Sequence, residues 1–250
     1  MSGHSKWHSI RHKKGVADAR RGKLFSKLTR AIIVAAREGG PDPASNLALQ
    51  NAIEKAREAS MPKDNIERAI ARGAGAGAGD SAYEHITYEG YGPGGVAVYL
   101  EALTDNRNRT AAEVRHTFSK NDGNLGESWS VAWLFERKGV VLVPAEVDAD
   151  ELLLAAADAG AEDVVQEGSS YRVTSAPEEL ETVRTALEAV GYPIESAQVT
   201  MVAKTTVPVE AESTAKKIVR LKDALEDTDD VQDVYANFDI PERVLEVAAS

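Results

Sequence analysis

Basic residues gather at the beginning of this sequence. The first 37 residues contain ten Lys and Arg side chains and one acidic residue, Asp18, which gives a local net charge of +9. Residues 76–250 carry a net charge of −19, so the whole chain of 250 residues is acidic, at −11. Lys and Arg bind the phosphates of nucleic acids, and each such contact releases counterions. An acidic protein that concentrates its cations at one end is expected to bind a polyanion there.

The candidate nucleic-acid-binding residues of this segment are cationic or polar, apart from one indole that could stack on an unpaired base. They are Lys6, Trp7, Arg11, His12, Lys13, Lys14, Arg20, Arg21, Lys23, Lys27 and Arg30. The sequence contains no zinc-finger, basic-zipper or RNP motif that would read bases, so the composition suits RNA as well as duplex DNA. The alternative interpretation is a charged face that is merely solvated, which is the usual meaning of a run of charges.

A second candidate consists of Asn106, Arg107, Asn108 and Arg109, directly before a predicted helix. That helix is expected to begin at Thr110, the first residue of a T-x-x-E capping box. The free N–H groups of a helix start attract anions, and arginine adds forked donors for a phosphate. The alternative is turn chemistry, since Asp and Asn favour turns and helix caps without any ligand.

Nothing in the sequence predicts catalysis. It contains no nucleophile elbow, P-loop or HExxH motif, and no pair of carboxylates stands out by its spacing. It also lacks cysteine, which excludes disulfides, thiol catalysis and cysteine metal sites. His4, His8 and His12 would align on a helix and could there hold a metal ion. No carboxylate ligand lies nearby, so we expect these histidines to supplement the basic segment instead. The expected protein is not an enzyme and uses no metal and no cofactor.

The chain shows no sign of a membrane segment or a secretory signal. No run approaches the roughly 18 apolar residues that a membrane-spanning helix needs. The first 14 residues have no apolar core, although their basic character resembles an organellar transit peptide, which stays open as an alternative. We therefore expect a cytoplasmic protein that has no membrane partner.

The elements that would position the cations begin with three helices, expected at residues 15–38, 45–58 and 62–72. In the first of them, one face is apolar and an adjacent stripe is basic. The apolar face consists of Leu24, Phe25, Leu28, Ile32 and Ala35. Residues 1–75 are thus predicted to form a basic arm and a helical domain, followed by a Gly/Ala linker at residues 76–80.

Beyond the linker, the sequence alternates between strands and helices. A strand is expected over residues 128–135, with Trp129, Val131, Trp133 and Phe135 packed on one side. Residues 131–204 follow the order β-α-β-β-α-β, which is typical of a ferredoxin-like domain. Residues 81–130 and 205–240 would pair into a second, discontinuous α/β domain into which 131–204 is inserted. The predicted fold is therefore α+β and multidomain, with an N-terminal three-helix domain followed by two α/β domains.

Several long stretches resemble the YebC/PmpR family. They are GHSKWHSIRHKK, RGKLFSKLTR, YEGYGPGG, TDNRNRTAAEVRHTFSK and GNLGESWSVAWLFERKG, and the resemblance runs from Gly3 to about Phe238. It implies three domains and a DNA-binding regulator of transcription, while mitochondrial relatives are described as translational activators and some bacterial members are linked to relief of stalled ribosomes. One position departs from the family pattern GNLGxxGSV, because Trp129 stands where that pattern has a glycine.

Three functions follow as hypotheses. The first is a non-enzymatic DNA-binding regulator of transcription, and the second is an RNA- or ribosome-binding translation factor. The third is a protein-interaction module whose basic domain binds an acidic partner. The expected partner is thus a nucleic acid, either DNA or RNA and possibly the ribosome, and the sequence indicates no small-molecule substrate.

Overall fold

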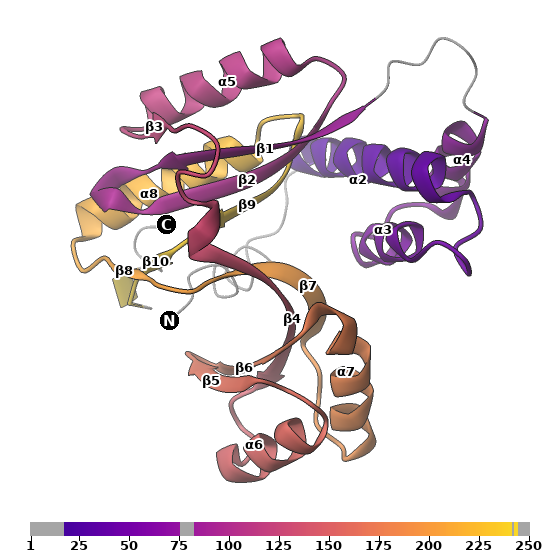
Figure 1. Ribbon diagram of the computed structural model, residues 1–250, viewed down its shortest axis with the longest axis vertical. Helices are drawn as coiled ribbons and strands as arrows, with labels where there is room; N and C mark the ends of the chain where they lie inside the picture. Colours follow the sequence, from indigo (N-terminus) through magenta and orange to yellow (C-terminus); the bar gives the residue numbers. More distant parts are fainter. Residues whose placement is uncertain (1–17, 76–82, 242, 245–250) are drawn as a thin grey trace.

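The computed structural model describes residues 18–75, 83–241 and 243–244, with side chains from Arg21 onward (Figure 1). Its architecture confirms the predicted fold class: a three-helix N-terminal region is followed by two α/β sheet units. The described helices include none that is long and apolar enough to cross a membrane.

The N-terminal region packs three amphipathic helices around a small apolar core. They are α2 (Asp18–Gly39), α3 (Leu47–Glu58) and α4 (Lys63–Ala74). Ile32 of α2 and Leu49 of α3 are fully buried there, whereas Leu24 of the predicted apolar face is 38% exposed. Asn46 joins two of the helices, because its Oδ1 accepts the N–H of Leu49 and its Nδ2 donates to the carbonyl of Ala35.

The first sheet is antiparallel, with the strand order β3-β1-β2-β9. Its strands are β1 (Glu84–Tyr91), β2 (Ala97–Thr104), β3 (Asn124–Leu125) and β9 (Val231–Ala236). Helices α5 (Arg107–Lys120) and α8 (Glu212–Glu226) pack on one face, where Phe118 and Leu225 are completely buried among the strand residues. A two-stranded parallel sheet of β8 (Val207–Pro208) and β10 (Phe238–Asp239) lies beside this unit (Figure 1).

The second sheet is formed entirely by the chain between β3 and β8. Its elements are β4 (Phe135–Pro144), α6 (Ala149–Asp158), β5 (Asp163–Glu167), β6 (Ser170–Ser175), α7 (Leu180–Ala189) and β7 (Ser196–Ala203). The spatial order β5-β6-β4-β7, with antiparallel pairs throughout, has the ferredoxin-like topology that the sequence predicts. Phe135 and Tyr235 pack together in a cluster that joins the two sheets.

The predicted strand at residues 128–135 is wrong. The backbone curls there into the 3₁₀ helix η2 (Ala132–Leu134), and the strand begins only at Phe135. The cause is the buried carboxylate of Glu89, whose oxygens accept the N–H groups of Trp129, Val131 and Ala132 at 2.7–2.8 Å. Val131 is nevertheless buried, as expected, in a cluster with Phe135 and Tyr235.

The same turn overturns the predicted packing of the two tryptophans. The side chain of Trp129 is 79% exposed and that of Trp133 is 62% exposed, so neither belongs to the core. Trp129 has a φ of +68°, in the left-handed region that glycine adopts without strain. This conformation explains why a glycine suits the position, and why a tryptophan there projects into solvent.

Candidate nucleic-acid interface

The predicted basic arm lies mostly outside the described residues. This applies to Lys6, Trp7, Arg11, His12, Lys13 and Lys14, while only the backbone of Arg20 is described. Their role in binding nucleic acid stays a prediction. The remaining candidates are Arg21, Lys23, Lys27 and Arg30 on α2 and the four residues from Asn106 to Arg109.

Two of the α2 cations, Lys23 and Lys27, are directed at the end of α8. The ammonium of Lys23 donates to the carbonyl of Asp227 at 3.1 Å, and the ammonium of Lys27 donates to the carbonyl of Glu226. The last carbonyls of a helix have no partner within it and carry partial negative charge, so cations near them are stabilising. The basic stripe therefore attaches the N-terminal region to the first sheet unit, a role that its composition alone does not indicate.

Asp230, just before β9, is the centre of this junction. Its Oδ1 accepts a hydrogen bond from Arg30 at 2.8 Å, and its Oδ2 accepts from Arg109 at 2.7 Å. The hydroxyls of Thr110 and Thr104 donate to the same Oδ2 at 2.7 and 3.0 Å. Burial of Asp230 would raise the pKa of its carboxyl, but the hydrogen bonds from Arg109 and the two threonines outweigh it and lower the pKa.

The start of α5 differs from the prediction. Asn106, not Thr110, is the N-cap, since its side chain accepts the N–H of Arg109 at 3.1 Å and the helix begins at Arg107. Thr110 is already in the helix, where its buried hydroxyl is committed to Asp230. The T-x-x-E pattern therefore predicts the right region for the start of the helix but the wrong capping residue. The hydroxyl of Thr110 donates to the buried carboxylate of Asp230 and does not cap the helix.

The structure brings the two predicted clusters together. Arg30 of α2 and Arg109 of α5, which are 79 positions apart in the sequence, bind the two oxygens of one carboxylate. Arg107 stays largely in solvent, with 69% of its side chain exposed and Glu84 at 3.8 Å, and Asn108 is exposed beside it. A phosphate approaching the start of α5 would therefore meet Arg107 and Asn108, while Arg109 is held by Asp230 and by Asp105 at 2.8 Å.

Sequence reasoning missed Asp230 and the carbonyls at the end of α8. Asp229 and Asp230 resemble the many other acidic surface residues, and nothing in their spacing links them to residues 30 or 109. The only available signal was the valine-rich segment that follows, because a carboxylate next to a buried strand is more often paired than one in a loop.

The described residues offer no metal centre, since they contain no group of three or more His, Asp or Glu side chains that could hold an ion. The metal alternative for His4, His8 and His12 falls outside the described residues. A groove between α5 and α8, of about 190 Å³, is smaller than the roughly 300–1,000 Å³ of typical small-molecule sites.

Comparison with known proteins supports this architecture. A family model for the TACO1/YebC N-terminal domain matches residues 5–76, and one for the second and third TACO1/YebC domains matches residues 83–238. A crystal structure of a conserved hypothetical protein from Aquifex aeolicus is similar, with a TM-score of 0.77 and 54% identity, over 90% of this chain and 93% of that one.

Curated relatives are similar over nearly their whole length. A protein of Rubrobacter xylanophilus is 61% identical over 246 residues, which cover 98% of each chain, and is named a probable transcriptional regulatory protein. A protein of Natranaerobius thermophilus with the same name is 54% identical over 98% of this chain and 99% of its own. From its N-terminal helices to its last strand, this chain belongs to the YebC/PmpR family, whose domains are also called TACO1/YebC domains.

Proposed function

We propose that this chain is a non-enzymatic regulator of gene expression that binds nucleic acid, with duplex DNA as its first candidate target. Its relatives are named probable transcriptional regulatory proteins, which supports a regulatory role. The charge distribution supports a polyanionic partner, because a net charge of +9 lies within the first 37 residues of a chain whose net charge is −11.

The observation that carries the proposal is the meeting of the two basic segments at Asp230. Residues 1–17 directly precede α2 in the sequence, and Asp230 joins α2 to the exposed start of α5. A strand held by the arm would thus find further donors at Arg107 and Asn108. Binding of this kind acts by occupancy, since the protein holds the nucleic acid and no bond is made or broken.

Two charge reversals in the arm test the proposal. The variant Lys13→Glu/Lys14→Glu should bind a fluorescent duplex DNA at least about tenfold more weakly than the natural chain, because two phosphate contacts become repulsions. Binding that survives unchanged would show that the arm is not the nucleic-acid-binding surface. The matched control reverses Lys204 and Arg243, which are exposed in the α/β region and should change the affinity far less.

A second candidate function is an RNA- or ribosome-binding factor in translation. The observation that favours it is the exposure of Trp129 and Trp133, because single-stranded bases stack on exposed aromatic rings whereas the bases of a duplex are not available. Ultraviolet crosslinking in cells, followed by sequencing of both DNA and RNA, separates the two functions. Enrichment of promoter DNA supports the first, and enrichment of ribosomal or messenger RNA supports the second.

A further inference from the structure

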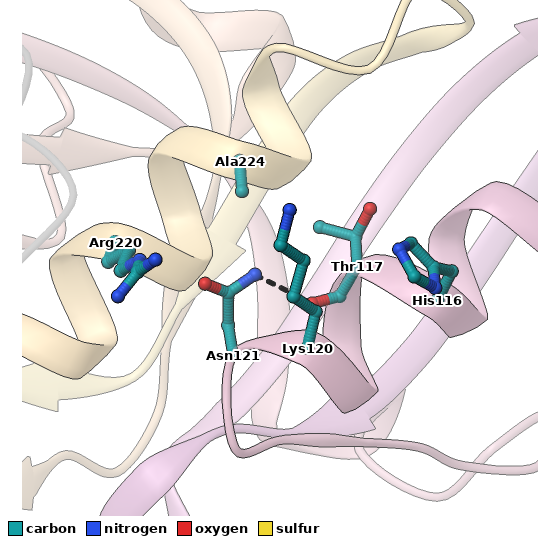
Figure 2. Close-up of a pocket in the computed structure, with 6 residues that line it drawn as sticks. All are labelled: His116, Thr117, Lys120, Asn121, Arg220 and Ala224. Atoms are coloured by element: carbon teal, nitrogen blue, oxygen red, sulfur yellow. Dashed lines mark hydrogen bonds between the residues drawn. The ribbon is translucent and has the colours of Figure 1, made fainter.

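A cationic groove lies between the outer sides of α5 and α8. Figure 2 shows His116 and Lys120 on α5 and Arg220 on α8, with the short side chain of Ala224 leaving room between them. Thr117 and Asn121 complete the lining. Three of these six residues are basic or can become so, and none is acidic.

The basic side chains of this groove have no partner within the described part of the chain. No hydrogen bond or ion pair there engages Lys120, Arg220 or His116. Neighbouring lysines behave differently, since Lys216 lies 2.6 Å from Glu212 and Lys217 lies 2.9 Å from Asp122. Acidic residues are thus available nearby, yet the cations of the groove are left unpaired.

The groove is held open by a rigid base. Phe118 of α5 and Leu221 of α8 are buried against the first sheet, so the positions of both helices are fixed by packing. The Nδ2 of Asn121 donates to the carbonyl of Thr117 at 2.8 Å, which closes the end of α5 and leaves the Oδ1 without a partner in the described residues (Figure 2). Lys120 and His116 are four residues apart and therefore share one side of the helix.

Helix α5 connects the candidate interface at its start with the groove near its end. Helix α5 has 14 residues, so it is about 21 Å long, and its exposed side starts at Arg107 and Asn108. Arg115 is exposed between that end and the groove, again without an ion pair in the described residues. A length of about 21 Å corresponds to roughly six nucleotides of a strand.

We propose that the α5–α8 groove binds the phosphodiester backbone of the same nucleic acid, as a second contact beyond the N-terminal arm. This inference rests on the proposed function. Lys and Arg supply the charge, and Thr and Asn side chains are common donors to phosphate oxygens. The small open volume admits a phosphate and its neighbours along a strand, and it offers no enclosed site for a base or for a larger metabolite.

The test measures binding of the full chain to a fluorescent single-stranded RNA of about 20 nucleotides, while KCl is raised from about 50 to about 200 mM. The variant Lys120→Glu/Arg220→Glu should bind at least about tenfold more weakly at the lower salt concentration. The slope of log K against log[KCl] should fall in magnitude by about 1.4, because two contacts to a single strand are lost. A duplex DNA of the same length is measured in parallel.

The control variant Lys204→Glu/Arg243→Glu makes the same change in net charge at two other exposed positions. If both double variants lose the same affinity, the effect comes from net charge and the groove is not a site. If only the control retains the affinity and the slope of the natural chain, the groove is confirmed. A natural chain that binds neither polymer refutes the proposed function itself, which separates that failure from failure of the groove.

Folding and ligand class are checked in the same series. Thermal unfolding should be unchanged in Lys120→Glu/Arg220→Glu, and a variant that unfolds is replaced by Lys120→Gln/Arg220→Gln, which should also lower the slope. The charge-preserving variant Lys120→Arg/Arg220→Lys should keep the salt slope of the natural chain. Displacement of the RNA by polyglutamate as readily as by polyphosphate would overturn the assignment, because it would show an acidic-protein site.

Discussion

The guanidinium of Arg30 lies 2.8 Å from the Oδ1 of Asp230, although 200 positions separate the two residues in the chain. This ion pair joins the N-terminal helices to the first sheet unit, and 16% of the Arg30 side chain and 5% of the Asp230 side chain remain exposed. A pair so shielded from water is sensitive to the loss of either partner, because the group left behind is a buried, unpaired charge.

Replacing Asp230 with Ala should therefore destabilise the protein strongly. Arg30, Thr104 and Thr110 would lose their common acceptor, and we expect a loss of about 3 kcal/mol in the free energy of unfolding. Urea denaturation followed by circular dichroism measures the change. The control is Asp229→Ala, because Asp229 is exposed and contributes only its backbone carbonyl to Arg30; equal losses in both variants would contradict the account.

The pKa of Asp230 predicts how stability depends on pH. Its folded pKa is lowered below the ordinary 3.8, so the ionised form contributes stability above that value, and this stability is lost as pH falls through the folded pKa. Between about pH 5 and about pH 2, the natural chain should lose more free energy of unfolding than Asp230→Asn does. Parallel curves for the two proteins would show that the hydrogen bonds to the carboxylate contribute nothing.

Lys27 should behave differently from the lysines of the arm. Because its ammonium donates to the last turn of α8, the variant Lys27→Glu should lower the free energy of unfolding by about 1 kcal/mol, and Lys13→Glu should leave it unchanged. Thermal unfolding monitored by circular dichroism compares the two. If Lys27→Glu is as stable as the natural chain, the contact between Lys27 and the end of α8 contributes nothing to the free energy of unfolding.

Trp129→Gly should make the protein more stable. The tryptophan holds a φ of +68° and is 79% exposed, so glycine relieves backbone strain and removes little packing. We expect a gain of about 1 kcal/mol and a rise in Tm of roughly 2–4 °C. Trp133→Gly is the matched control, because its backbone is helical and glycine there should destabilise; stabilisation by both changes would remove strain as the cause.

Local patterns predicted most of the architecture. The period of Phe25, Leu28, Ile32 and Ala35 placed the buried side of α2 correctly, because that side is set by residues within a few turns. The β-α-β-β-α-β order followed in the same way from short alternating segments and turn residues. In both cases, the apolar residues that must be buried recur with the period of the helix or strand, so the sequence alone shows the pattern.

The errors arose where a distant group decides the local structure. Glu89 curls residues 129–132 by accepting three of their N–H groups, and Asp230 takes the hydroxyl of Thr110 from its expected capping role. The alternation of Trp129 and Trp133 resembles a strand, yet a carboxylate 40 residues away determines their exposure. No spacing rule connects such partners, so the junction at Asp230 could be found only in three dimensions.

The central claim is that this chain binds nucleic acid through its cations, and the salt dependence of the natural chain tests it most directly. Dissociation constants for a duplex DNA and for a single-stranded RNA are measured by fluorescence anisotropy as KCl is raised from about 50 to about 200 mM. We predict binding to at least one polymer, with a slope of log K against log[KCl] of about −3 or steeper, as four or more phosphate contacts require. Binding to neither polymer at the lowest salt concentration, or an affinity that KCl does not change, would contradict the account.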